Sequence, residues 1–324
     1  MQDFIGVEGV MDRERLQALS RRSNARGLVQ LASHLGVLAA NTVALAYTWG
    51  TWWGVPLFIL QGILINFLYA PQHEANHWTA FESKWLNDWV ARLCGFLALR
   101  SSDYERWEHF AHHRNTQNWE KDPELLMRRP FTSAGQYLLM FSGIQLLEFR
   151  FRMLVRHARG DFPEWFLTGR QRRLIAKSSR WHLGLYAAIA VAAVALETWW
   201  PLTLWVLPYA ATKWVYWMQG LGEHTGLTHE PNTLRNTRTF RTNWFMRWVN
   251  WNMTYHTVHH TYPGVPFFAL PRLHREVEAA FGALPTDRYF RFHWGMVRAL
   301  LAGKNEHEIC GDAPPDAAAA PAPA

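Results

Sequence analysis

The sequence predicts an all-α membrane protein in which four transmembrane helices form two hairpins and a cytoplasmic helical cap covers one end of them. Three observations lead to this fold. Apolar residues gather in two pairs of stretches, and each pair is joined by a turn that contains two tryptophans. None of the 33 Lys and Arg residues lies in 27–83 or 181–212. Three tight clusters of histidines flank the apolar stretches.

The first hairpin is expected to have spans at 28–49 and 55–72, joined by the turn GTWWG. The stretch 28–49 reaches the roughly 20 residues that an α-helix needs to cross a bilayer. Its polar groups include His34 and Asn41. The second stretch is shorter if it stops at Pro71, but it can continue into the first histidine cluster.

The second hairpin is expected at 181–197 and 201–219, joined by ETWWPLT. The repeated TWW places indole pairs where a boundary between membrane and water is expected. Both hairpins begin and end on the side that carries the basic residues, and the positive-inside pattern makes this side cytoplasmic. We therefore expect the histidine clusters and both termini in the cytoplasm. The segment 1–26 lacks the pattern of a cleaved signal peptide and is expected to be retained there.

The rest of the chain is expected to complete one membrane domain over 27–312. Residues 84–180 are basic, and within them 137–156 is apolar yet carries several charges. This segment could be an amphipathic helix in the membrane interface or a helix in the core of the cytoplasmic part. A turn-rich loop follows the third histidine cluster, and a helix is expected near 272–281. The tail 313–324 is low in complexity and is expected to be disordered.

Charge and cysteine content exclude several classes of protein. The net charge of +7 could indicate a nucleic-acid partner, but the basic residues flank apolar stretches and are not interleaved with aromatic residues on one surface. We therefore predict a lipid bilayer and no nucleic acid as a partner. Cys94 and Cys310 are the two cysteines, and their spacing rules out a disulfide framework and a CxxC motif.

The histidine clusters are HEANH, HFAHH and HTVHH, and they contain His73, His77, His109, His112, His113, His256, His259 and His260. Residues three or four apart lie on one face of a helix, so each cluster can aim its imidazoles at a common point. One metal rarely takes more than three or four protein nitrogens. Eight donors therefore predict two metal ions. Iron fits such a set best, because structural zinc sites prefer cysteine and copper sites use fewer histidines with Met or Cys.

The order HxxxH, HxxHH, HxxHH around two hairpins resembles the integral-membrane fatty acid desaturase superfamily, over about residues 30 to 300. The resemblance implies a non-haem centre of two irons, O2 as co-substrate and electrons from a ferredoxin or a similar donor. It also implies desaturation or hydroxylation of an unactivated C–H bond. Members carry one more histidine after the last span, and His224 in the motif GEHTG is the better match. His229 is the other candidate. With His224 the predicted ligand set contains nine histidines, and we assign no catalytic residue beyond them.

Several polar residues could orient the ligand imidazoles through their second ring nitrogen. The candidates are Glu74, Asp122, Glu124, Glu223, Asn250 and Asn252. The alternative for each carboxylate is an ordinary solvated loop charge.

The segments HHRNTQNWEKDPEL and NWNMTYHTVHHTYPG resemble a bacterial branch of the superfamily. That branch also includes the rhizopine-catabolism protein and dihydrorhizobitoxine desaturase, which act on small amines and amino-acid derivatives. We predict an enzyme of the bacterial inner membrane that desaturates a fatty acyl or related substrate. The alternatives are desaturation of a small amino-acid-derived molecule and a hydroxylase or demethylase reaction. The sequence does not fix the substrate, the regiochemistry or the oligomeric state.

Two alternative hypotheses do not involve the oxidation of a substrate by O2. A membrane electron carrier with haem between two histidines requires histidines inside the spans on facing helices, and His34 alone fits. Otherwise His34 is a buried histidine with a hydrogen bond. A histidine-rich metal transporter requires polar groups at bilayer depth, and the predicted spans offer few.

Overall fold

The fold is helical, with two short strands as its only sheet among the described residues. The computed structural model describes residues 11–125 and 128–311, so the expected disordered tail at 313–324 lies outside them, as do residues 1–10. The first half contains α1 (Arg13–Leu19), α2 (Asn24–Thr48), α3 (Gly54–Asn66), α4 (Tyr69–Asn76), α5 (Lys84–Leu97), α6 (Ser102–Asn115), α7 (Ala134–Met140) and α8 (Ile144–Arg159).

The second half begins with the long helix α9. It contains α9 (Gly169–Ala195), the π-helix η1 (Leu202–Val206), α10 (Leu207–Ala211), α11 (Lys213–His224), α12 (Thr233–Asn236), α13 (Trp244–Val249), α14 (His256–Thr261), α15 (Leu270–Phe281), α16 (Tyr289–Leu301) and α17 (Glu306–Cys310). Strands β1 (Thr239–Phe240) and β2 (Thr286–Asp287) pair in parallel. The helix expected near 272–281 is confirmed as α15.

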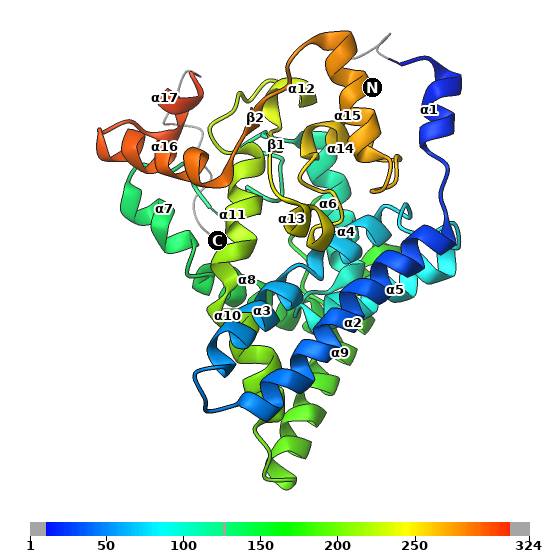
Figure 1. The fold of residues 1–324 in the computed structure, drawn as a ribbon, viewed down its shortest axis with the longest axis vertical. Helices are drawn as coiled ribbons and strands as arrows, with labels where there is room; N and C mark the ends of the chain where they lie inside the picture. The colour runs from blue at the N-terminus through cyan, green and yellow to red at the C-terminus, as the bar shows by residue number, and fades with distance from the viewer. Residues whose placement is uncertain (1–10, 126–127, 312–324) are drawn as a thin grey trace.

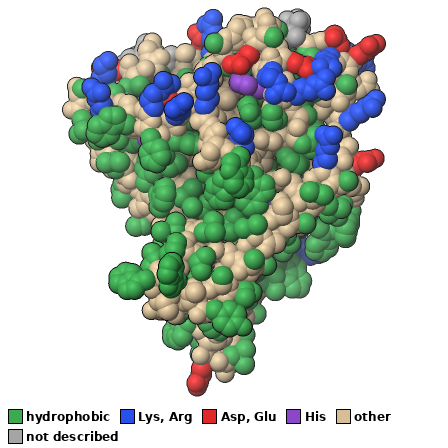
Figure 2. All heavy atoms as spheres, viewed as in Figure 1, with side chains coloured by type: hydrophobic (Ala, Val, Ile, Leu, Met, Phe, Trp, Pro, Cys, Tyr) green, Lys and Arg blue, Asp and Glu red, His purple; other side chains and the backbone are tan. Residues whose placement is uncertain are grey.

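The molecule narrows toward one end, which is built from α2, α3, α9, η1 and α10, while the remaining elements form a broad cap at the other end (Figure 1). Hydrophobic side chains cover the narrow end, and Lys and Arg side chains gather around the broad end (Figure 2). This separation is the one that the spacing of the basic residues along the sequence predicts.

Two helices of the described chain are long and apolar enough to cross a membrane. They are α2 and the helix 54–76, in which α3 and α4 follow one another through a short break at Phe67 and Leu68. These two correspond to the first predicted hairpin, and the second limb runs into the first histidine cluster, as the sequence allowed.

The second predicted hairpin is less regular than the first. Its first limb is the apolar half of α9, whose opening turns are basic, and its second limb is divided into η1, α10 and α11. Pro201 precedes the π-helix, which widens the turn after the TWW motif. Helix α9 is 27 residues long, but its basic opening turns shorten its apolar run, and the second limb is interrupted at Thr212. Neither is therefore among the helices of the described chain that are long and apolar enough to span.

Buried amides join the two hairpins. Gln61 donates to the carbonyl of Leu204 at 2.9 Å, and Asn66 donates to the carbonyl of Tyr209 at 2.9 Å. A Cβ at Gly62 would meet the backbone of Pro208 and the side chain of Thr212, so only glycine permits α3 and α10 to cross this closely. Small residues and interhelical hydrogen bonds are the means by which helices associate in lipid.

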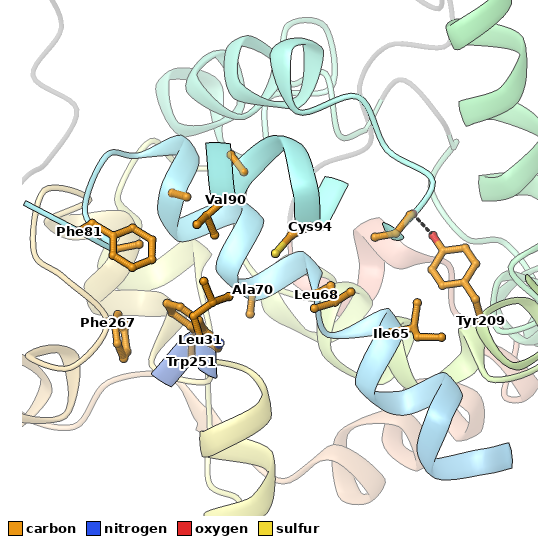
Figure 3. Close-up of a cluster of buried hydrophobic side chains, with 14 residues drawn as sticks. Leu31, Ile65, Leu68, Ala70, Phe81, Val90, Cys94, Tyr209, Trp251 and Phe267 are labelled. Carbon is orange, nitrogen blue, oxygen red and sulfur yellow. Dashed lines mark hydrogen bonds between the residues drawn. The ribbon is translucent and has the colours of Figure 1, made fainter. Parts of the chain in front are cut away.

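A hydrophobic core lies where the hairpins meet the cap. It includes Leu68 in the break between α3 and α4, Phe81 between α4 and α5, Cys94 on α5, and Trp251 and Phe267 in the loops after α13 and α14 (Figure 3). This core fixes α4 against α5 and against the loop that follows the third histidine cluster. It thereby positions two of the three clusters.

The segment 137–156 forms parts of two helices, α7 and α8, which are separated at Gly143 with φ of 68°. Helix α8 buries Leu146, Met153 and His157 and exposes Ile144 and Phe151. It therefore has the amphipathic character that the sequence indicates, with one face against α9.

Candidate metal centre

Four helices deliver histidines to one buried site. Helix α4 carries His73 and ends at His77, α6 carries His109, His112 and His113, α11 ends at His224, and α14 carries His256, His259 and His260. All nine side chains are buried. The structure therefore brings together every histidine that the sequence selected. The first and last of them, His73 and His260, are 187 positions apart in the sequence.

The short helix α14 is held in place by threonines. The Thr257 hydroxyl donates to the carbonyl of Thr237 at 2.9 Å, and the Thr239 hydroxyl donates to Thr257 at 3.1 Å. Helix α14 has only six residues, so these contacts with the segment before and within β1, rather than its own helical length, fix the third cluster.

The histidines form two adjacent groups. In the first, one ring nitrogen of each of His73, His77, His109, His113 and His259 lies within 4.8 Å of the others. In the second, the ring nitrogens of His112, His224 and His260 meet the same limit. His256 joins the second group through its ring, whose centroid lies 4.5 Å from that of His260 and 5.1 Å from that of His224.

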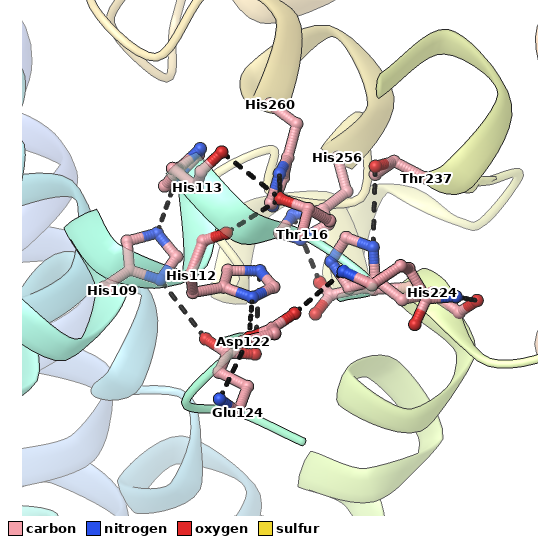
Figure 4. Close-up of polar contacts among 12 residues, drawn as sticks. His109, His112, His113, Thr116, Asp122, Glu124, His224, Thr237, His256 and His260 are labelled. Carbon is pink, nitrogen blue, oxygen red and sulfur yellow. Dashed lines mark hydrogen bonds and ion pairs between the residues drawn. The ribbon is translucent and has the colours of Figure 1, made fainter. Parts of the chain in front are cut away.

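The two groups of histidines lie directly against each other. The rings of His113 and His260 stack with centroids 4.1 Å apart, and a third set of possible ligands, His109, His112 and Glu124, lies across both groups. Figure 4 shows the side chains from α6, α11 and α14 pointing toward one another where the two groups meet. Two metal ions held by the two groups would therefore be neighbours.

Many of the buried ring nitrogens have no hydrogen-bond partner. Within the nine histidines of the site these are Nδ1 and Nε2 of His73 and His259, Nε2 of His77, His112, His224 and His260, and Nδ1 of His113 and His256. A buried polar atom without a partner costs about 1–3 kcal/mol. So many unpartnered nitrogens in one place are expected of a site that binds metal ions. Imidazole nitrogens are donors that suit iron.

Burial also keeps most of these imidazoles neutral, which is the form that binds a metal. It lowers the pKa of His224 to about 3 and that of His109 to about 4, although the Glu124 carboxylate opposes the shift at His109. His112 differs, because the carboxylates of Asp122 and Glu124 outweigh burial and raise its pKa to about 9. These carboxylates favour a positive charge at His112.

Polar groups hold the second nitrogen of several rings, as metal-binding histidines usually require. The Nδ1 atoms of His112 and His109 lie 2.8 Å from Asp122 and 3.3 Å from Glu124. The Nδ1 of His224 lies 3.0 Å from the carbonyl of Asn236. Asp122 and Glu124 thus have the positions that the sequence suggested.

Of the other residues suggested to orient an imidazole, only Glu223 lies beside one. A Glu223 oxygen lies 3.4 Å from Nδ1 of His256. Glu74 instead accepts hydrogen bonds from the Thr79 hydroxyl at 2.6 Å and the Phe267 amide at 2.9 Å, so it ties the first cluster to the loop after the third. The Asn252 amide donates to the Phe267 carbonyl at 3.2 Å, and Asn250 is buried beside it in the chain. Asn252 therefore braces the loop, the Asn250 side chain has no hydrogen-bond partner among the described residues, and neither residue is hydrogen-bonded to an imidazole.

His229 and His34 lie outside both groups. The indole of Trp119 donates to Nε2 of His229 at 2.8 Å. Nε2 of His34 lies 3.0 Å from the carbonyl of Leu64, and the ring it contacts belongs to Trp248. His34 is thus a hydrogen-bonded buried histidine, and the haem arrangement with two histidines facing each other in the spans is not formed by it.

Sequence reasoning missed the contacts that Thr116 and Gln117 make with the site. The Thr116 hydroxyl lies 3.3 Å from Nδ1 of His260, and the Gln117 side chain donates to the carbonyl of His224 at 2.8 Å. Their place directly after HFAHH was a usable signal. Asn236 gave no such signal, because it lies 12 residues after His224 and contacts it through a backbone carbonyl.

Comparisons with known proteins agree with this arrangement. The chain is 26% identical over 272 residues to a dihydrorhizobitoxine desaturase of Bradyrhizobium elkanii, with 77% of this chain and 74% of that protein covered. It is 23% identical over 302 residues to an sn-1 oleoyl-lipid 12-desaturase of Picosynechococcus, with 85% and 82% covered. It is also 23% identical to the enzyme of that name from Anabaena variabilis, covering 73% of this chain but 59% of that protein.

A model of the family called fatty acid desaturase matches residues 21–292. The match contains all three histidine clusters, His224 and both hairpins, and it ends within α16. Because it covers most of the chain and the structure gathers the same histidines into one buried site, the chain belongs to the fatty acid desaturase family of enzymes.

Proposed function

We propose that this protein is a membrane oxidoreductase that uses two irons and O2 to oxidise an unactivated C–H bond of its substrate. The observation that carries the proposal is the set of nine buried histidines with orphaned ring nitrogens in two adjacent groups. The first group would hold one iron and the second group, with His256, the other. When bound, such irons supply the reduction of O2 that C–H oxidation needs.

The reaction that we favour is desaturation. Two hydrogens leave adjacent carbons, and O2 takes them up with two further electrons and two protons to give two waters. A ferredoxin-type donor would supply the electrons. Insertion of one oxygen to give an alcohol, with the other oxygen leaving as water, is the alternative outcome and uses the same electrons.

The residues around the groups have definite tasks in this proposal. Asp122 and Glu124 hold His112 and His109 in the tautomer that offers Nε2 to the metal. The Asn236 carbonyl does the same for His224. The burial of all nine rings excludes water from the centre, which protects the reduction of O2 from side reactions.

We also propose that both hairpins cross the membrane, with the cap in the cytoplasm. Large apolar side chains cover the outside of the second hairpin, including Leu185, Val191, Val194, Leu196 and Trp199, each at least 46% exposed. Exposed apolar surface on this scale marks contact with a membrane or a partner. The bacterial inner membrane fits the basic cap on its cytoplasmic side.

The test is reconstitution of the purified, iron-loaded protein with a ferredoxin, its reductase and NADPH, followed by mass spectrometry of the products. Loss of two hydrogens identifies desaturation, and gain of one oxygen identifies hydroxylation. Iron content and the Mössbauer spectrum are measured on the same sample. We expect about two irons per chain, and a protein that binds haem or binds no iron would refute the proposal.

A further inference from the structure

A cavity beside the histidine groups is lined by two arginines that the metal centre does not use, Arg100 and Arg150, and by the carboxyl groups of Glu105, Glu108, Glu124 and Glu223. It lies among α4, α6, α8 and α11 and has a volume of about 100 Å³. Two of its lining residues, Glu124 and Glu223, contact histidines of the groups. A molecule in this cavity would therefore lie next to the metal centre.

Arg100 is the most informative of the lining residues. Its side chain is 8% exposed, and one of its terminal nitrogens pairs with Glu105. Its Nε and its other terminal nitrogen are buried and have no hydrogen-bond partner among the described residues. Arg100 lines the cavity, and its buried donors are incomplete without an acceptor. The missing partner is an anion or another strong acceptor.

Basic side chains are also concentrated here. The charged groups of Arg100, Arg150 and Lys213 lie 5.8, 5.5 and 4.7 Å from the centre of the Tyr216 ring. Within the described chain, Arg150 and Lys213 form no ion pair, but both donate to the Tyr209 hydroxyl, at 3.1 and 2.7 Å, and Lys213 also donates to Asn66 at 2.8 Å. Lys213 lies outside the cavity lining, so Arg150 is the lining cation without a carboxylate partner, and an anion between Arg100 and Arg150 would reduce the repulsion between them.

The distance from Arg100 to the metal centre limits the size of the anion. The guanidinium lies 4.6 Å from the centre of the Tyr69 ring, and this ring lies 5.3 Å from that of His73. One aromatic ring therefore separates the anion-binding group from the first histidine group. A carboxylate held at Arg100 would place carbons only a few bonds away beside the metal centre.

A long hydrocarbon fits the cavity poorly. An apolar groove of about 610 Å³ between α9 and η1 shares Leu99 and Tyr186 with the cavity, so an acyl chain from the membrane could approach there. To reach the histidines it would pass Arg100 and Arg150 and would offer no acceptor to the two unpartnered nitrogens of Arg100, which is costly in apolar surroundings. The usual pocket for a drug-sized ligand is about 300–1,000 Å³, well above this cavity.

We propose that the cavity binds a short carboxylic acid and that Arg100 and Arg150 hold its carboxylate. This substrate class rests on the proposed function, because the acid is the molecule that the irons would oxidise. Guanidinium groups bind carboxylates through paired, charge-assisted hydrogen bonds. The position of the acid follows from the lining residues, and its short length follows from the single ring between Arg100 and His73.

The probe is radiolabelled pentanoate, measured by equilibrium dialysis against the iron-loaded, full-length protein in nanodiscs. Arg150→Gln removes the cation but keeps a hydrogen-bonding side chain. The matched control is Arg152→Gln, because Arg152 lies on the same helix with a side chain that is 66% exposed and paired with Glu148. Arg100→Lys is the second test variant, since it keeps the charge next to Glu105 but loses the paired donors.

We expect Arg150→Gln to weaken pentanoate binding about 10- to 100-fold, Arg100→Lys to weaken it as well, and Arg152→Gln to leave it unchanged. Equal pentanoate affinity in all four proteins would overturn the proposal. So would turnover of an oleoyl lipid by a protein that does not bind pentanoate. Iron content is measured on the same samples. Pentanoate binding by a protein that binds no iron would support the anion site but refute the proposed oxidation reaction.

Discussion

At the scale of single residues, the site depends on how the second nitrogen of each imidazole is held. Asp122 accepts from His112 and also from the Gln117 amide at 2.9 Å, so one buried carboxylate fixes both a ring and the turn after α6. Such outer partners set the tautomer of the metal ligand and raise its basicity. The DPEL segment is therefore part of the metal site and not an ordinary surface loop.

Asp122→Asn should lower iron affinity about 10- to 100-fold without unfolding the protein, because the amide keeps the shape but loses the charge that favours a cation at His112. The matched control is Glu120→Gln, an exposed acid in the same turn, which should keep normal affinity. Iron bound after competition with a chelator measures both. Full iron retention by Asp122→Asn would show that Asp122 has no part in holding the metal.

His113→Ala and His259→Ala should each lose most of the bound iron and all turnover, since both rings belong to the group of five and carry orphaned nitrogens. His229→Ala is the control, because His229 contacts Trp119 and lies outside both groups. Iron per chain and product formation are the measurements. Unchanged iron and activity in both cluster variants would show that the ligand assignment is wrong.

At the scale of elements, the sequence predicts what depends on local spacing and misses what depends on contacts between distant segments. The histidine spacings predicted three helical clusters, and these are found on α4, α6 and α14. The first hairpin followed from two uncharged runs. The π-helix at 202–206 did not follow from any run, because it results from Pro201 and the packing of η1 against α3.

The anion-binding cavity shows the same limit. Arg100 lies between α5 and α6, Arg150 lies on α8, and Lys213, just outside the lining, lies on α11; no spacing connects them. Lys213 did give a signal, because it is the one Lys or Arg between residues 181 and 234. A lone lysine in an apolar run is expected to be buried with a polar partner, but its partners, Asn66 on α3 and the Tyr209 hydroxyl on α10, become visible only when these helices are placed beside α11.

The crossing of α3 and α10 gives a prediction about stability. Gly62→Ala should destabilise the protein by about 1–3 kcal/mol, because the added methyl group meets the Pro208 carbonyl and the Thr212 side chain. Gly36→Ala on α2 is the control: nothing lies within 4 Å of a Cβ there, and alanine favours the helix. Melting temperatures in detergent should therefore move in opposite directions. A Gly62→Ala protein that melts at or above the original temperature would contradict the close crossing.

At the scale of the whole molecule, one arrangement explains both the surface and the site. The apolar narrow end and the basic broad end meet at the level where the histidine helices leave the hairpins (Figures 1 and 2). In the proposed membrane arrangement the hairpins fix the ends of α4 and α11 at the membrane surface, and the cap contributes α6 and α14. A metal site built in this way requires both hairpins to be anchored at once.

This arrangement requires both tryptophan turns to lie on the side of the membrane opposite the cap. Thr51 and Glu197 are exposed in these turns, and Glu14 is exposed on α1 at the cap. In a cysteine-free background, Thr51→Cys and Glu197→Cys should react with a membrane-impermeant maleimide in intact spheroplasts, whereas Glu14→Cys should react only after lysis. Glu197 is the decisive position, since α9 begins with basic turns and the limb after it is broken into η1, α10 and α11, so neither has the continuous apolar run of an ordinary span. If Glu197→Cys reacted only after lysis, the second hairpin would lie on the cytoplasmic side, and the irons would be held between one membrane hairpin and a surface-bound one.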